Sequence, residues 1–183
     1  MKRVQQGDYK AFEELYMKYR KPIYGYFLSK TKSKEEAEEL LQDAFMKVLN
    51  KRDTFKFESK FSTWLWTLAR NLFIDKYRAD YSHVQKSDSQ DEDSNVLVEN
   101  LDSGLESAEV MLIKKSEEKG IRLCIEELSH NQKETLLLRI YSDMSYEEIS
   151  TTLDLTVSSI KSLLVRSKEK LINCLKNGGH HEA

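Results

Sequence analysis

Residues 61–71 read FSTWLWTLARN and hold both tryptophans of the chain, Trp64 and Trp66. In a strand, positions two apart share one face, whereas in a helix they lie about 200° apart, at roughly 100° per residue. Apolar residues recur here at helical spacing, at Phe61, Leu65, Leu68, Ala69 and Leu72. The segment is therefore predicted to be a helix whose apolar stripe has one tryptophan on each flank. One buried face cannot cover both rings.

The flanks of this predicted helix carry cations as well as aromatic rings. On the helical wheel, Asn71 and Arg78 share the flank of Trp64. Arg70 shares the flank of Trp66. Rings interleaved with cations are typical of a surface that stacks bases and holds phosphates. The alternative is that each ring is half-buried at a core margin, because tryptophan is seldom fully buried.

Two more helices are predicted upstream of this segment. Residues 7–27 have apolar side chains at helical spacing, with a kink expected near Pro22. The second helix begins at a capping box, Ser33 to Glu36, in which the hydroxyl and the carboxylate satisfy free amides of the first turn. Residues 50–60, NKRDTFKFESK, have no such periodicity and are predicted to form a loop.

The C-terminal part of the chain has the pattern of a helix-turn-helix. A capping box that starts at Ser145 opens a short predicted helix, and a longer helix follows a turn at Asp154. Asp154 is expected to adopt the left-handed conformation of the turn, and Thr156 to cap the longer helix. Two further helices are predicted before this motif, one over residues 105–127 and one from a capping box at Ser129.

These elements predict an all-α fold of two small helical domains, the C-terminal one a helix-turn-helix. The predicted boundaries are residues 1–79 for the first domain, 80–104 for a linker, 105–177 for the second domain and 178–183 for a tail. The linker is rich in Asp, Ser and Glu, which favours a flexible acidic tether. The alternative is that it mimics nucleic acid and occupies a basic channel.

Charge is distributed unevenly along the chain. Residues 1–78 carry a net charge of +6, residues 79–111 a net charge of −8, and residues 112–183 a net charge of 0. A basic block next to an acidic one indicates a polyanionic partner for the basic block. The neutral C-terminal block is expected to bind DNA weakly by itself.

Several classes of protein are disfavoured by what the sequence lacks. The opening MKRVQQGDYK has no apolar core, so no signal peptide is predicted, and no membrane insertion is expected. Cys124 and Cys174 lack metal-type spacing and, without an export signal, are expected to be reduced in a cytoplasmic protein. Neither a catalytic constellation nor a Gly-rich phosphate loop is found. The chain is predicted to be no enzyme and to need no metal or cofactor.

Three stretches resemble bacterial RNA polymerase sigma factors of the extracytoplasmic function (ECF) group. Residues 35–55, EEAEELLQDAFMKVLNKRDTF, resemble the helix that grips the clamp of the core polymerase. Residues 60–78, KFSTWLWTLARNLFIDKYR, resemble the helix that melts and reads the −10 promoter element. Residues 128–171, LSHNQKETLLLRIYSDMSYEEISTTLDLTVSSIKSLLVRSKEKL, resemble the −35-binding helix-turn-helix. With residues 6–28 also similar, the resemblance covers most of the chain except the linker.

The resemblance implies a function and a set of partners. It implies a subunit that binds core RNA polymerase through its clamp and flap elements, recognises the −35 and −10 elements of promoter DNA, and melts the duplex. It also implies an anti-sigma factor as a further partner. Asp154 stands where many members have glycine, and Leu163 where many have a basic residue. The second departure removes one phosphate contact that the family would supply.

The resemblance also implies which residues form each surface. The −10 DNA-binding residues would be Lys56, Phe57, Lys60, Phe61, Trp64, Thr67, Arg70, Asn71 and Arg78. The −35 DNA-binding residues would be Thr156, Ser158, Ser159, Lys161, Ser162, Arg166 and Lys168. The residues that bind core polymerase would be Glu39, Gln42, Asp43 and Met46.

Two other functions remain open from the sequence. The first is a stand-alone helix-turn-helix regulator with an N-terminal helical sensor or dimerisation module, which the neutral C-terminal block argues against. The second is a helical adaptor that does not bind DNA, which the basic residues 1–78 argue against.

Overall fold

A computed structural model describes residues 1–31, 33–84 and 120–176, with side chains described up to Arg78 in the second range. Regular structure in these ranges is helical, which confirms the all-α prediction. The N-terminal half comprises α1 (Lys2–Gln5), α2 (Tyr9–Leu28), α3 (Lys34–Asn50), the short 3₁₀ helix η1 (Arg52–Thr54) and α4 (Phe61–Val84). The C-terminal half comprises a short helical segment at residues 120–126, α6 (His130–Tyr141), α7 (Tyr146–Leu153) and α8 (Val157–Lys176).

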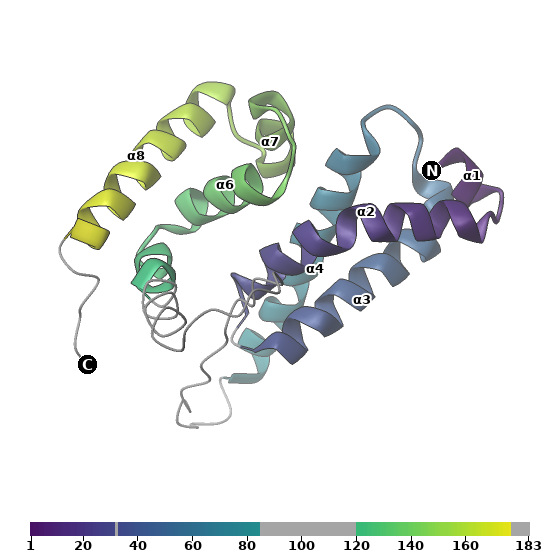
Figure 1. Cartoon of the computed structure of the whole chain (residues 1–183), viewed down its shortest axis with the longest axis horizontal. Helices are drawn as coiled ribbons and strands as arrows, with labels where there is room; N and C mark the ends of the chain where they lie inside the picture. The colour runs from purple at the N-terminus through teal and green to yellow at the C-terminus, as the bar shows by residue number, and fades with distance from the viewer. Residues whose placement is uncertain (32, 85–119, 177–183) are drawn as a thin grey trace, which may run out of the picture.

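The N-terminal half is built on three long helices that lie side by side (Figure 1). α3 packs against both α2 and α4. Their apolar stripes meet in a core in which Phe27, Leu40 and Leu65 are buried. Burying each such side chain stabilises the fold by about 1.5–3 kcal/mol. The stripe predicted for residues 61–72 is therefore the core face of α4.

Side-chain caps define where α2 and α3 begin. The amide of Ala11 donates to the carboxylate of Asp8 at 3.1 Å, and the amide of Glu36 donates to the hydroxyl of Ser33 at 3.1 Å. The predicted start at Ser33 is thus confirmed. α2 continues through Pro22 as one helix to Leu28. The short helix α1 was not predicted.

The helix-turn-helix forms as the sequence predicts. The amide of Glu148 donates to the Ser145 hydroxyl and the Glu148 carboxylate accepts from the Ser145 amide, so the capping box is complete. Asp154 ends α7 in the left-handed conformation, with φ of 55°. Thr156 caps α8, because its hydroxyl accepts from the amide of Ser159 at 3.1 Å. These three local signals set where α7 begins and ends and where α8 begins.

The predicted linker is described only at its start. α4 runs to Val84 and so includes residues 80–84 of the predicted linker. The rest of that linker and residues 105–119 of the next predicted helix lie outside the described residues. Within the described ranges, no helix is long and apolar enough to cross a membrane.

The two halves pack against each other and share one apolar core. α2 contacts α6, and α4 contacts α7. The core that contains Leu65 and Trp66 continues through Leu137 on α6 and Ile160 on α8. The helices approach so closely at Gly25 that a Cβ atom there would lie 2.5 Å from Cε1 of Tyr141. Only glycine fits at this crossing without a shift of the Tyr141 ring.

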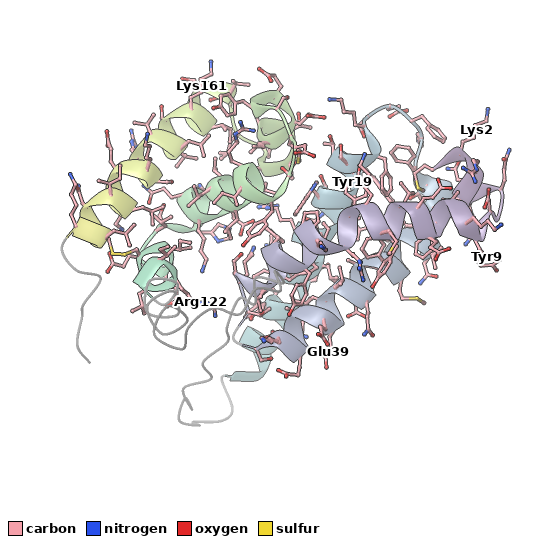
Figure 2. All side chains as sticks on the ribbon, viewed as in Figure 1. Lys2, Tyr9, Tyr19, Glu39, Arg122 and Lys161 are labelled. Carbon is pink, nitrogen blue, oxygen red and sulfur yellow. A yellow bond between two sulfur atoms is a disulfide. The ribbon has the colours of Figure 1, made fainter. Side chains whose placement is uncertain are left out.

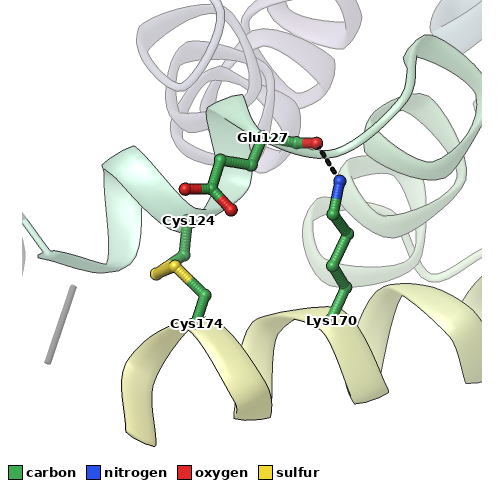
Figure 3. The surroundings of a disulfide bond; sticks show 4 residues. All are labelled: Cys124, Glu127, Lys170 and Cys174. Carbon is green, nitrogen blue, oxygen red and sulfur yellow. Dashed lines mark hydrogen bonds between the residues drawn. A yellow bond between two sulfur atoms is a disulfide. The ribbon is translucent and has the colours of Figure 1, made fainter. Parts of the chain in front are cut away.

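The prediction of reduced cysteines is wrong. Cys124 and Cys174 form a disulfide that ties residues 120–126 to the C-terminal end of α8 (Figure 3). Beside it, the ammonium of Lys170 donates to the carbonyl of Glu127. The prediction failed because the two cysteines are 50 residues apart in sequence and meet only after the helices pack.

Candidate nucleic-acid interface

The loop between α3 and α4 presents an exposed aromatic ring. Phe57 has φ of 61°, a conformation that is rare for bulky residues, and its side chain is 54% exposed. The Phe57 ring meets the buried Phe55 edge-on, with centroids 4.8 Å apart. Gln5 of α1 holds the loop in place. Its side-chain amide donates to the backbone carbonyls of Arg52 at 2.8 Å and Phe55 at 3.0 Å. The loop backbone is thus fixed, while the Phe57 ring remains exposed to solvent.

An aromatic cluster connects this loop to α4. Trp64 packs against Phe55 and Phe61, with ring centroids 5.5 and 5.9 Å apart. Phe61 also meets Tyr19 of α2 edge-on at 5.6 Å. Trp64 and Phe61 are both half-buried, so each combines a packing role with an accessible edge. The half-buried reading of the sequence holds for Trp64.

The other tryptophan is a core residue. Trp66 is 1% exposed, and its ring meets that of Tyr26 edge-on with centroids 5.4 Å apart. The flank of α4 that carries Trp66 therefore faces α2 and the C-terminal half. The sequence left the role of Trp66 open, and the packing resolves it as structural.

The remaining predicted −10 residues divide by exposure. Lys56, Asn71 and Arg78 are exposed. The hydroxyl of Thr67 donates to the backbone carbonyl of Thr63 at 2.8 Å, a local helix bond. Lys60 and Arg70 are engaged by carboxylates of the C-terminal half, so the structure does not bring all nine residues to one open surface.

The carboxylate that engages Lys60 belongs to Glu148 at the start of α7. Lys60 Nζ lies 3.2 Å from Glu148 Oε1, and the Thr63 hydroxyl donates to the same oxygen at 3.1 Å. The amide of Ser145, followed by the side chains of Lys60 and Thr63, holds the pKa of Glu148 below its ordinary value. Glu148 therefore carries its negative charge at neutral pH while it serves both the cap and the contact with α4.

A buried ionic cluster joins the two halves around Glu134 of α6. Glu134 is 2% exposed, and one of its oxygens pairs with the ammonium of Lys30, whose side chain is 4% exposed. The Tyr26 hydroxyl donates to the other oxygen at 3.0 Å, and Arg70 Nε lies 3.6 Å from that oxygen as an ion pair. The Lys30 ammonium also lies 4.0 Å from the centroid of the Phe73 ring. The Glu134 carboxylate thus contacts three side chains of the N-terminal half, those of Lys30, Tyr26 and Arg70.

Burial shifts the proton equilibria of this cluster. Burial, and then the neighbouring Glu134 carboxylate, raises the pKa of Tyr26 well above its ordinary value. Burial lowers the pKa of Lys30, while the Glu134 charge opposes that shift. The cluster could not be predicted from the sequence, because Lys30 and Glu134 lie 104 residues apart. The sequence around each residue has no pattern that distinguishes it from a solvent-exposed charged residue on a helix.

α8 presents a polar and cationic face. Of the predicted −35 residues, Ser159 is partly buried and shares a hydrogen bond with Thr156; the others, Thr156, Ser158, Lys161, Ser162, Arg166 and Lys168, are exposed. Figure 2 shows Lys161 at the outer margin of the C-terminal half. Val165 lies between these side chains on the helix and is 57% exposed. Val165 was not among the predicted residues, and its methyl groups could contact a thymine methyl in a major groove.

The predicted polymerase-binding residues share one exposed face of α3. Glu39, Gln42, Asp43 and Met46 are all exposed, opposite the buried Leu40 and Ala44. Met46 is 55% exposed, an apolar side chain among charges. Glu39, which is labelled in Figure 2, pairs with Lys76 of α4 at 3.2 Å.

Comparison with known proteins matches both halves. A family model of sigma-70 region 2 matches residues 15–82, and one of sigma-70 region 4 matches residues 119–171. The RNA polymerase sigma-H factor of Pseudomonas aeruginosa is 28% identical over 177 residues, covering 96% of this chain and 92% of the relative. The ECF RNA polymerase sigma factor SigM of Bacillus subtilis is 29% identical over 172 residues, covering 94% of this chain and 99% of the relative.

Solved structures match the arrangement as well. The sigma factor RpoE from Bartonella quintana, in complex with the anti-sigma factor NepR, aligns with a TM-score of 0.73 and 26% identity, over 91% of this chain and 98% of that chain. CnrH, in complex with the cytosolic domain of CnrY, aligns with a TM-score of 0.68 and 18% identity, over 96% of this chain and 94% of that chain. The second match supports the fold alone.

Proposed function

The chain belongs to the sigma-70 family, in its ECF group, and we infer that it binds core RNA polymerase and directs promoter recognition and DNA melting for transcription initiation. The observation that carries this function is the order of two matched regions, region 2 and then region 4, with exposed candidate DNA residues in both. Like other sigma factors, it would catalyse no reaction itself. It would act in the cytoplasm, where RNA polymerase works.

The domain division proposed for this function follows the predicted boundaries. Residues 1–79 would form the region 2-like domain, residues 80–104 the linker and residues 105–177 the region 4-like domain. The matches over residues 15–82 and 119–171 support this division. A stand-alone helix-turn-helix regulator is not favoured, because the N-terminal half also matches a sigma region rather than a sensor module.

The exposed loop and the aromatic cluster would melt and read the −10 element. Extruding a base costs on the order of a few kcal/mol, and stacking on a ring recovers roughly 1–3 kcal/mol per base. Phe57 presents the most open ring of the cluster, and Phe61 and Trp64 offer edges beside it. The exposed cations Lys56 and Arg78 would hold the flanking phosphates.

Two further surfaces would complete the complex. The polar face of α8 would enter the major groove at the −35 element, with Arg166 and Lys168 on phosphates or base edges. The exposed face of α3 around Met46 would bind the polymerase clamp. Because the RpoE structure contains an anti-sigma factor, we also propose an anti-sigma factor for this chain.

Run-off transcription with purified bacterial core polymerase tests this function. Genomic fragments from the source organism are transcribed with and without the chain. The expected result is a set of discrete start sites that depend on the chain and share two upstream elements. If no start site depends on it, and it does not co-purify with core polymerase, the function is wrong.

Replacing the exposed ring of the loop is expected to impair melting specifically. Phe57→Ala should lower open-complex formation by about 5- to 150-fold, the loss of one stacked base. The free energy of unfolding should change by less than about 1 kcal/mol, because the ring is 54% exposed. Permanganate reactivity of unpaired thymines on a promoter from the run-off experiment measures the first effect. Tyr9→Ala, which removes a ring that is 83% exposed on α2, is the matched control and should melt DNA normally.

Replacing a cation of α8 is expected to change the salt dependence of promoter binding. Arg166→Ala should reduce the slope of log K against log salt concentration by about 1, through loss of one phosphate contact. The slope is measured with the polymerase holoenzyme on the same promoter. Lys18→Ala, which removes an exposed cation of α2, should leave it unchanged. An unchanged slope for Arg166→Ala would exclude this residue from the phosphate contacts.

A further inference from the structure

The short helix α1 lies outside the segment that the region 2 family model matches. That match begins at residue 15, whereas α1 spans Lys2–Gln5. α1 nevertheless packs against both α2 and η1, so it lies beside the connection between α3 and α4 (Figure 1). The family match therefore gives no role to this contact.

α1 is anchored to the rest of the N-terminal half. Val4 is 3% exposed, so its side chain ties α1 to the interior. Gly7 takes φ of 84°, a conformation that glycine adopts without strain and that lets the chain turn from α1 into α2. Arg3 Nε lies 2.8 Å from the carboxylate of Asp8, which is the N-cap of α2. α1 is thus held at a defined place and can restrain the loop beside it.

Gln5 carries the contact from α1 to that loop. Its partly buried side-chain amide donates to the carbonyl of Arg52 at 2.8 Å and to that of Phe55 at 3.0 Å. The two bonds match the two N–H donors of one amide group. Arg52 is the first residue of η1 and Phe55 follows its last. One side chain therefore clamps both ends of this turn.

The clamped turn leads directly into the strained residue of the loop. Phe57 follows Phe55 by two positions and has φ of 61°. A bulky residue in this conformation is strained, and it persists only where the surrounding structure holds it. The Phe57 ring touches Phe55 by an edge contact and is otherwise 54% exposed. The restraint on the Phe55 backbone is therefore what sets the direction of the Phe57 ring.

We propose that Gln5 is a positioning residue for promoter melting, because it holds the loop backbone in the conformation that presents the Phe57 ring to an unpaired base. The proposal rests on the proposed role of Phe57 at the −10 element. Gln5 touches no DNA itself and acts through the ring. A ring that is fixed before DNA arrives needs less ordering on binding, so a larger fraction of the chain is competent to capture a base.

Two matched variants test the proposal. Gln5→Met keeps the length of the side chain and removes both donors. Gln6→Met makes the same substitution one position further on, where the side chain is exposed. A fluorine label at the para position of the Phe57 ring reports the surroundings of the ring by NMR in the free chain. Permanganate reactivity of the polymerase holoenzyme on a promoter from the run-off experiment reports open-complex formation.

The expected result joins the two measurements. Gln5→Met should move the fluorine signal toward that of the urea-unfolded chain. It should lower open-complex formation about tenfold, the order of magnitude that two hydrogen bonds give to the competent fraction of the loop. Gln6→Met should change neither. An unchanged fluorine signal, or a shifted signal with normal melting, would overturn the proposal.

A double variant separates positioning from general support of the fold. If Gln5 acts through the ring, Gln5→Met should cause no further loss of melting in a chain that already carries Phe57→Ala. For the same reason, the loss from Gln5→Met alone should not exceed the loss from Phe57→Ala. Losses that multiply in the double variant would show that Gln5 acts otherwise than through Phe57, and the proposal would be wrong.

A second substitution covers the case in which Gln5→Met does not fold, which circular dichroism would report. Gln5→Glu also keeps the length of the side chain, and its carboxylate can donate to neither carbonyl. It should reproduce the shifted fluorine signal and the loss of melting. Normal melting by Gln5→Glu would contradict a positioning role for the Gln5 amide.

These outcomes are separate from those of the proposed function. If the unchanged chain directs no transcription, the sigma function is wrong, whereas the fluorine signal still decides whether Gln5 fixes the ring. If the chain directs transcription and Phe57→Ala impairs melting but Gln5→Met does not, the function stands and the positioning role is wrong.

Discussion

Trp66→Ala is expected to lower the free energy of unfolding by about 3–5 kcal/mol, a large part of the stability of a typical domain. The side chain is 1% exposed, so its removal leaves a cavity as well as losing the burial of the ring. The ring also meets Tyr26 at 5.4 Å, and the Tyr26 hydroxyl is bound to Glu134. The cavity would therefore loosen the contact between the halves too. Urea unfolding followed by circular dichroism gives the change.

Trp64→Ala is the matched control, because it removes the same side chain two positions away on α4. Trp64 is half-buried between Phe55 and Phe61 at the edge of the loop. It should lose only about 1–2 kcal/mol, because a half-buried ring forfeits less transfer free energy and leaves a space that water can enter. Expressed as a free energy, the loss in open-complex formation should exceed the loss in the free energy of unfolding. A loss for Trp64→Ala equal to that for Trp66→Ala would contradict the assignment of Trp66 as the core tryptophan.

Features that depend on near neighbours could be predicted from the sequence. The capping box at Ser145, the left-handed turn at Asp154 and the cap at Thr156 each involve partners within a few residues, and all three form as predicted. The helical stripe of residues 61–72 is likewise a local pattern, and its members Leu65 and Ala69 are fully buried. Exposure of the α3 face and of most α8 residues follows from the same periodicity.

Features that depend on the meeting of distant segments could not be predicted. Helical periodicity placed Trp66 beside the stripe, and the ring is buried only because Tyr26 of α2 covers that flank. The Lys30–Glu134 pair lies across the contact between the halves, where no local pattern distinguishes a buried charge from a solvated one. Helical periodicity also does not distinguish buried apolar residues from exposed ones such as Ile140 of α6 and Leu175 of α8, which are 59% and 46% exposed.

Reduction of the Cys124–Cys174 disulfide is expected to lower the free energy of unfolding of the C-terminal half by about 4 kcal/mol. The bond closes a loop of 50 residues. Releasing such a loop raises the entropy of the unfolded chain, which lowers its free energy by about 4 kcal/mol at 25 °C. Cys124 is 1% exposed and Cys174 is partly exposed, so the chain is unfolded before reduction to make the reaction complete. Urea unfolding of the oxidised chain and of the chain unfolded, reduced and refolded with reductant measures the difference, and thiol alkylation with mass spectrometry verifies each state.

A double variant separates the bond from the thiols themselves. Cys124→Ser with Cys174→Ser should unfold as the reduced chain does and should not respond to reductant. Its binding to a −35 duplex in the holoenzyme should weaken less than its stability, because the DNA-facing residues of α8 from Ser158 to Lys168 precede the tethered end at Cys174. Two alkylatable thiols in chain purified without reductant, or equal stability of oxidised and double-variant chains, would contradict a stabilising disulfide. If stability changes but −35 binding does not, the bond acts only on the helical segment at residues 120–126. The cap at Thr156 and the turn at Asp154 would then orient the recognition helix without it.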